Sequence, residues 1–357
     1  MSRCYLLRRM NSSKVKAIIY ALLAAVFYAV NVPMSKLLLD NVGETTMAAL
    51  LYLGAGIGIS ILSVFMKKDR KGSEKLSEND LPYVIGMIVL DIAAPIFLMI
   101  GISRGTSANA SLLGNFEIVA TTVVALIVFK EAVTKRLWLA IGLITISSVL
   151  LSLEGTDSFS FSYGSLFVLA ATVCWGFENN CTRKISSKST YEIVILKGFF
   201  SGPGALAIAF IKHENMPEWM YIAGALVLGL VAYGLSIFLY VRAQNVLGAA
   251  KTSAYYAVAP FVGAFLSFVF LKETLSWMYV IALFVMIAGS AVVVIDTLIR
   301  HHTHEHQHTF THTHDGSTHE HTITHVHDHA HYVTDSRHGH HHTKQELEHE
   351  PGAAHVG

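Results

Sequence analysis

Five ionisable side chains interrupt stretches of the sequence that are otherwise almost entirely apolar. The acids are Asp91, Glu117 and Glu178, and the bases are Lys197 and Lys251. Glu117, for example, lies near the middle of SLLGNFEIVATTVVALIVFKE. A buried carboxylate either binds a cation or exchanges protons, because desolvation disfavours its charged form. The solvent around these stretches therefore decides what chemistry they support.

Composition indicates that this solvent is a lipid bilayer. The chain has 357 residues, of which 53% are hydrophobic and 14% are charged, whereas soluble domains average about 25% charged residues. Runs of about 20 apolar residues match the thickness of a hydrocarbon core. Ten such windows occur, at 17–39, 44–65, 81–103, 106–129, 136–153, 163–183, 191–211, 219–241, 248–270 and 276–299. The sequence predicts an all-α membrane protein with ten transmembrane helices.

The distribution of Lys and Arg predicts the orientation of the chain. Basic residues concentrate before the first window and in the loops MKKDRKGSEKLSEND, KEAVTKR and RKISSKST, whereas DNVGE and EGTDSFSFS have none. Basic loops stay on the cytoplasmic side. We therefore expect a multi-pass plasma-membrane protein with both termini cytoplasmic, including an N-terminal segment at 1–16. The net charge of +1 gives no indication of a nucleic-acid partner.

The chain aligns with itself as an internal duplication. LIVFKEAVTKRLWLAIGLITISSVLL matches SFVFLKETLSWMYVIALFVMIAGSAVVV, and VFYAVNVPMSK matches VCWGFENNCTR. The two halves are 17–153 and 163–299. Because each half holds an odd number of spans, the halves must be oppositely oriented. Inverted repeats are a common plan of secondary transporters, with the substrate site between the halves.

These segments carry a family resemblance. The stretch AAKTSAYYAVAPFVGAFLSFVFLKETL, together with the openings VFYAVNVPMSK and VCWGFENNCTRK, resembles the EamA-type domain of the drug/metabolite transporter superfamily. The resemblance covers about 17–299 and implies two five-helix repeats, usually in an exporter of small metabolites. It also implies that the first, third and fourth helices of each half line the central path. The polar residues on those helices are Asn31, Asp91, Glu117, Glu178, Tyr233, Lys251, Tyr255 and Tyr256.

Each of these candidate path residues has a structural alternative. Asp91 and Glu117 are too deep for their short side chains to reach water, and the alternative to function is a buried pair with Lys197 or Lys251. Glu178 and Lys251 are closer to the cytoplasm and could reach water there. Tyr255 and Tyr256 could simply pack. GISRG spells the G-x-S-x-G motif but ends a membrane helix, so we do not expect an enzyme.

The residues after Arg300 differ from the rest of the chain. Nineteen of the 20 histidines lie here, and apolar residues are few, so we expect a disordered cytoplasmic tail at 300–357. Alternating His-x-His suits Zn, Ni, Co or Cu. The candidate metal ligands are His301, His302, His304, His306, His308, His312, His314, His325, His327, His329 and His331.

The expected function is a secondary transporter that exports a small polar, amino-acid-like metabolite by alternating access. Three acids against two lysines favour a cationic or zwitterionic substrate, and proton coupling would use the buried carboxylates. We expect no required cofactor. The alternative is a divalent transition-metal transporter whose tail collects ions for Asp91, Glu117 and Glu178.

Overall fold

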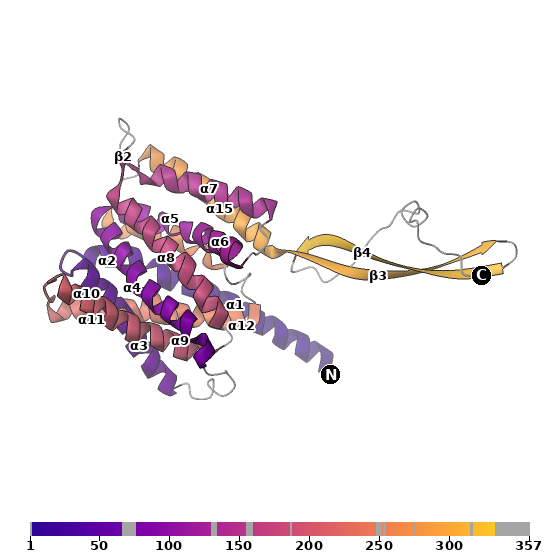
Figure 1. The fold of residues 1–357 in the computed structure, drawn as a ribbon, viewed down its shortest axis with the longest axis horizontal. Coiled ribbons are helices and arrows are strands. Elements are labelled where there is room, and N and C mark those ends of the chain that lie inside the picture. Colours follow the sequence, from indigo (N-terminus) through magenta and orange to yellow (C-terminus); the bar gives the residue numbers. More distant parts are fainter. Residues whose placement is uncertain are drawn as a thin grey trace. The chain divides into compact units, whose positions relative to one another are not determined.

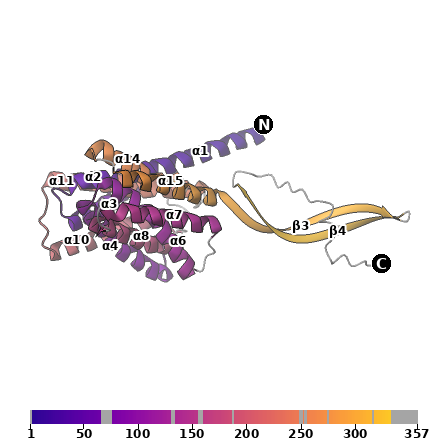
Figure 2. The same cartoon turned by 90° about the horizontal axis from the view of Figure 1, so that it is seen from above.

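The structure is a computed structural model that describes residues 2–65, 76–129, 134–154, 160–185, 188–247, 252, 255–273, 276–314 and 317–332. Its contacts divide the chain into two units, Met1–Asp296 and Thr297–Gly357. The first unit is helical and the second contains a β-hairpin (Figures 1 and 2).

Helices account for nearly all of the first unit. In the first half they are α1 (Ser2–Ala29), α2 (Asn31–Leu38), α3 (Glu44–Phe65), η2 (Glu78–Asp80), α4 (Leu81–Arg104), α5 (Ser107–Leu113), α6 (Phe116–Phe129) and α7 (Lys135–Ser152). In the second half they are α8 (Tyr163–Ile185), α9 (Thr190–Leu196), η3 (Lys197–Ser201), α10 (Gly202–Ile211), α11 (Trp219–Gly229), η4 (Leu230–Leu235), α12 (Ser236–Leu247), α14 (Ala259–Leu271) and α15 (Trp277–Leu298). Between the halves, β1 (Leu153–Glu154) pairs with β2 (Ser160–Phe161).

Eight helical stretches among the described residues are long and apolar enough to cross a membrane. They coincide with eight of the ten predicted windows. The remaining two windows, 163–183 and 248–270, are occupied by α8 and by α14 with the segment before it. Helix α8 is 23 residues long but polar in its second half, where Glu178 and two asparagines occur. Helix α14 has 13 residues. The prediction of a polytopic helical protein is confirmed.

Large apolar side chains on the outside of the bundle agree with a lipid environment. Phe65, Ile211 and Phe284 are among many exposed apolar side chains. In water such a surface would promote association, whereas a bilayer solvates it. Trp219 and Trp277, both exposed, stand at the first positions of α11 and α15. Tryptophan favours the boundary between lipid and water.

Glycines allow two close helix crossings that position the polar residues of the interior. A Cβ on Gly56 of α3 would lie 2.9 Å from the Cα of Gly198 in η3. A Cβ on Gly164 of α8 would lie 2.9 Å from the carbonyl oxygen of Gly101 in α4. Small residues let membrane helices approach until their backbones touch. As a result, α4 packs along α8 (Figure 1), and α3 packs against η3.

Several spans are interrupted rather than continuous. The seventh and eighth windows each contain a π-helical segment, η3 and η4. Val30 separates α1 from α2, and Gly114 and Asn115 separate α5 from α6. In α4, Pro95 lacks the N–H that would bond to the carbonyl of Asp91. Such irregular backbone occurs at membrane depth where it is buried in protein or lines a cavity.

Two glutamates of the second half cap helices of the first half. Glu214 accepts hydrogen bonds from the backbone N–H groups of Thr45 (3.1 Å) and Thr46 (2.8 Å) at the start of α3. Glu273 accepts from the N–H groups of Ser107 (2.7 Å) and Ala108 (2.8 Å) at the start of α5. A carboxylate at a helix N-terminus satisfies unpaired donors and complements the helix dipole.

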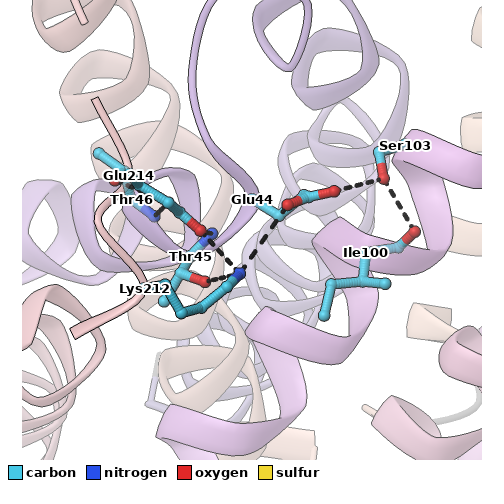
Figure 3. A network of polar contacts seen from close by, with 7 residues as sticks. All are labelled: Glu44, Thr45, Thr46, Ile100, Ser103, Lys212 and Glu214. Atoms are coloured by element: carbon cyan, nitrogen blue, oxygen red, sulfur yellow. Dashed lines mark hydrogen bonds and ion pairs between the residues drawn. The ribbon is translucent and has the colours of Figure 1, made fainter. Parts of the chain in front are cut away.

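Lys212 and Glu44 extend the Glu214 cap into a network (Figure 3). The ammonium of Lys212 donates to Glu214 at 2.8 Å and lies 3.9 Å from Glu44. Glu44 accepts from the hydroxyl of Ser103, at the end of α4, at 3.0 Å. This network, the rim network, joins the ends of α3, α4 and α10.

The second unit differs from the disordered tail expected from composition. Strands β3 (Ile299–His314) and β4 (Ser317–Tyr332) form an antiparallel pair. The expectation rested on the scarcity of apolar residues. Histidine alternates with threonine and other residues at a period of two, which is typical of strands. The intervening Asp-Gly pair favours a hairpin loop. Residues 333–357 lie outside the described residues.

Candidate functional site

A charged cluster lies inside the bundle and consists of Asp91 on α4, Glu178 on α8 and Lys197 on η3. The ammonium of Lys197 is 2.5 Å from Glu178 Oε1 and 3.1 Å from Asp91 Oδ2. The side chains of Lys197, Asp91 and Glu178 are 8%, 1% and 5% exposed. Thr182, one turn along α8, donates a further hydrogen bond to Glu178. Two carboxylates thus share one ammonium in a site without bulk water.

A tyrosine connects this triad to the second polar group of the interior. Tyr52 on α3 donates to Asp91 Oδ1 at 2.7 Å, and its ring lies 5.2 Å from the ring of Tyr233 on η4. The hydroxyl of Tyr233 accepts a hydrogen bond from Asn31 Nδ2 at 3.4 Å, and Asn31 in turn accepts one from Ser35 at 3.1 Å. The chain of contacts therefore runs from α8 through η3, α4, α3 and η4 to α2.

Aromatic rings continue from Tyr233 toward the ninth window. Tyr28 lies 6.3 Å from Tyr233 and 5.9 Å from Tyr256, and Tyr256 lies 5.1 Å from Tyr240. The hydroxyls of Tyr256 and Ser236 are 3.2 Å apart. These rings present both π faces, which attract cations, and hydroxyl groups.

Glu117 forms a hydrogen bond with a residue outside the Asp91–Lys197–Glu178 triad. At the start of α6, its Oε1 accepts a hydrogen bond from Asn179 Nδ2 at 2.6 Å. Asn179 directly follows Glu178 on α8, so successive side chains of one helix contact Glu117 and Lys197. Glu117 is half-buried, and Asn179 is its hydrogen-bond partner in the interior.

The structure thus brings together most of the residues predicted to line the path. Asp91 and Glu178 meet at Lys197, Asn31 meets Tyr233, and Glu117 meets Asn179, the residue after Glu178. Tyr255 is half-buried beside Tyr256 in the chain. Lys251 lies outside the described residues. The alternative expectation, a buried pair of an acid with Lys197, holds for the geometry of Asp91, whereas Glu117 has an amide rather than an ammonium as its hydrogen-bond partner.

Three further residues of the interior did not stand out in the sequence. Tyr52 and Tyr28 are tyrosines in apolar windows, where tyrosine usually packs or marks an interface. Asn179 is adjacent to Glu178 and could have been found, because two amides beside a carboxylate in one span are unusual. The π-helical segments that carry Lys197 and Tyr233 have no sequence signature comparable to that of a proline.

No metal-binding group of three or more His, Cys, Asp or Glu occurs among the residues whose side chains are described. A small hollow lies elsewhere, at the ends of α4, α5 and α8, and is lined by Gly101, Thr106 and Asn109 among others. Gly101 is ten residues along α4 from Asp91, or about 15 Å at the rise of an α-helix. The hollow is therefore distinct from the charged triad.

Apolar spans interrupted at polar residues, around a charged cluster drawn from both halves of the chain, define a multi-pass membrane protein of the transporter class. The model of the EamA-like transporter family matches residues 15–153 and 162–295. The chain belongs to this family, and through it to the drug/metabolite transporter superfamily. The matched ranges agree with the two halves of the internal duplication.

Relatives support the same class. An "Uncharacterized transporter" of Methanothermobacter thermautotrophicus is 25% identical over 285 residues, covering 74% of this chain and 82% of the relative. The "Uncharacterized transporter YyaM" of Bacillus subtilis is 21% identical over 257 residues, covering 68% and 82%. A solved structure described as "Crystal structure of protein" has a TM-score of 0.57 at 16% identity and covers 80% of this chain and 97% of its own. It supports the fold.

Proposed function

We propose that the chain is a secondary transporter that exports a small cationic or zwitterionic, amino-acid-like metabolite across the plasma membrane. Ten spans form two oppositely oriented five-helix repeats, with both termini cytoplasmic, and the substrate passes between the repeats by alternating access. The observation that carries this proposal is the Asp91–Lys197–Glu178 triad, in which two buried carboxylates share one ammonium.

The charge of the triad explains why it suits such a substrate. With all three groups ionised, the cluster carries one excess negative charge in a medium of low dielectric constant, which is unfavourable. A proton or the ammonium of a substrate would neutralise this charge. Exchange between the two provides a physical basis for proton-coupled export. Hydroxyl and amide groups of Tyr52, Tyr233 and Asn31 would bind the remaining polar part of the substrate.

The pairing of the halves agrees with an inverted arrangement. Helix α4 packs along α8, and α1 packs along α12. In the order of the ten windows, α4 and α8 are the third and the sixth, and α1 and α12 are the first and the eighth. The third helix of each half therefore packs against the first helix of the other half. Helices α3 and α5 pack against α10 and α14, which are their counterparts. A two-fold relation between the halves would produce this set of contacts.

The alternative of a divalent-metal transporter lacks a comparable observation. Asp91 and Glu178 face the ammonium of Lys197, which would compete with a metal ion for both carboxylates. Soft or imidazole ligands, which transition metals prefer, do not accompany these acids among the residues whose side chains are described.

Transport in everted membrane vesicles tests the proposal. Amino acids and Zn, Ni and Co ions are compared as substrates for the full chain and for a chain ending at Arg300. We expect transport of an amino-acid-like substrate by both chains, with dependence on a pH gradient. Metal transport that disappears when the tail is removed would contradict the proposal and support the alternative.

Glu117→Gln tests the role of the interior acids in the same vesicles. We expect a loss of transport or an altered pH dependence, because the substitution removes a carboxylate from an apolar span beside Asn179. Glu214→Gln, in the rim network, is the matched control and should retain the wild-type pH profile of transport. An unchanged rate and pH profile in Glu117→Gln would contradict a functional role for Glu117.

A further inference from the structure

The pairing register of the hairpin places histidines opposite histidines. The four opposed pairs are His302 with His329, His304 with His327, His306 with His325, and His312 with His319. Three of these pairs are separated by two residues along each strand. Positions i, i+2 and i+4 of a strand share a face, so these three pairs form consecutive rungs on one face of the hairpin.

The same register gathers nearly all histidines of the hairpin on this face. Directly opposed positions of an antiparallel pair lie on the same face. Every histidine of β3 and β4 except His301 falls on it, while threonine and acidic residues dominate the other face. The sequence pattern alone places the histidines of each strand on one face of that strand. The register makes the two faces coincide, because a shift of one residue would move the histidines of β4 to the opposite side.

Opposed histidines at this spacing match the requirements of a transition-metal ion. Opposed residues have Cβ atoms about 4.5–5.5 Å apart, and imidazole binds Zn²⁺ at about 2.0–2.1 Å from each nitrogen. One rung can therefore supply two ligands to one ion. Two adjacent rungs contain four imidazoles, the number in a closed tetrahedral zinc site.

We propose that the rungs His302/His329, His304/His327 and His306/His325 form a binding site for a divalent transition-metal ion such as Zn²⁺. Binding depends on the strand register and not only on the abundance of histidine. The site is independent of the transported substrate, so a failure of the proposed export function would leave it unaffected.

A variant of identical composition separates register from abundance. It exchanges three histidines of β3 with the following residues: His302→Thr with Thr303→His, His304→Glu with Glu305→His, and His306→Gln with Gln307→His. The moved histidines then occupy the other face, opposite Asp328, Val326 and Thr324. Zn²⁺ binding is measured by titration of the full-length protein in detergent against a chromophoric competing chelator.

We expect the exchanged variant to bind Zn²⁺ at least about tenfold more weakly, since even the loss of an outer-shell partner weakens metal sites by about 10–100-fold. Equal affinity in the variant and the wild type would overturn the proposal, because it would show that any histidine-rich chain suffices.

A second variant controls for the number of imidazoles. His301→Ala, His308→Ala and His321→Ala remove three histidines whose opposed residues are Ala330, Ile323 and Phe310. All three proposed rungs remain. The dissociation constant of the tightest Zn²⁺ site should therefore stay within about threefold of the wild-type value, which is a smaller change in binding free energy than a tenfold change in affinity would give. A loss as large as that of the exchanged variant would also overturn the proposal.

Discussion

Two charged networks of the bundle use the same residue types in opposite settings. In the rim network, Glu214 accepts hydrogen bonds from Lys212 and from the backbone and hydroxyl of Thr46. The Lys212 side chain is 41% exposed. In the interior triad, Asp91 and Glu178 share Lys197, and none of the three side chains is more than 8% exposed. Each network pairs two carboxylates with one lysine, but the lysine of the first is exposed and Glu214 has backbone donors as well, whereas the second is buried.

This difference in burial changes what each network contributes to stability. Glu214 stabilises the start of α3, because a carboxylate at a helix N-terminus satisfies donors that would otherwise be unpaired. The triad gives no such net gain, because the desolvation of three charges offsets their attraction, and apolar residues of similar volume would often be at least as stable. An arrangement of this kind in a transporter is better explained by what it binds.

Lys197→Met should have the largest effect and would separate the two networks most clearly. Removing the ammonium leaves two carboxylates close together and buried, and breaking a buried pair costs roughly 3–5 kcal/mol. We expect a large fall in the thermal unfolding midpoint in detergent, partly restored by adding Glu178→Gln. Lys212→Met, the matched control, should cost about 0–1 kcal/mol, as for exposed ion pairs. Similar small changes in both variants would contradict the comparison.

Tyr52→Phe should have an intermediate effect that sharpens the description of the triad. The substitution keeps the ring and its contact with Tyr233 but removes the donor to Asp91. Hydrogen bonds to charged groups contribute about 1.5–3 kcal/mol, so stability should fall by an amount in this range. Tyr83→Phe, at an exposed position of α4, is the control and should unfold with the wild type. Wild-type stability in Tyr52→Phe would mean that Asp91 does not depend on this donor.

Glu214→Gln should have the smallest effect, with a defined pH dependence. Burial alone would raise the pKa of Glu214, but hydrogen bonds from Lys212, Thr45 and Thr46 outweigh it and lower the pKa to about 2. The folded-state pKa lies below the unfolded value, so the carboxylate stabilises the fold above about pH 4.5 and progressively less down to about pH 2. Loss of a helix cap costs about 0.5–2 kcal/mol.

The measurement is the difference in thermal midpoint between the wild type and Glu214→Gln as a function of pH. This difference should be constant near neutral pH and should narrow below about pH 4.5. Glu192→Gln, a substitution away from the rim network, should show no comparable dependence. A difference that widens on acidification would contradict the assigned role of Glu214.

The sequence predicted the spans better than the contacts within them. Apolar length is a property of each window alone, so eight of ten windows could be placed within a few residues. Asp91, Glu117 and Glu178 were found because a charge in such a window is conspicuous. Tyr52 and Tyr28 were not, because their contacts with Asp91 and Tyr233 depend on which helices pack side by side, and each window taken alone does not predict that.

For the tail, composition did not predict the secondary structure. Its composition suggested disorder, since few apolar residues are available to form a core. The alternation of histidine indicates metal ligands, but the partner strand and the register cannot be predicted from composition. Pairing between distant segments is set by both strands together.

The glutamate caps make the two halves of the chain dependent on each other. The N-terminal ends of α3 and α5 belong to the first half, yet the carboxylates that satisfy them, Glu214 and Glu273, come from the second. A fragment ending before residue 163 would therefore expose two helix ends without their acceptors. Co-expressed fragments could recover these bonds only by docking, so neither repeat is a complete folding unit, although the same family model matches each of them.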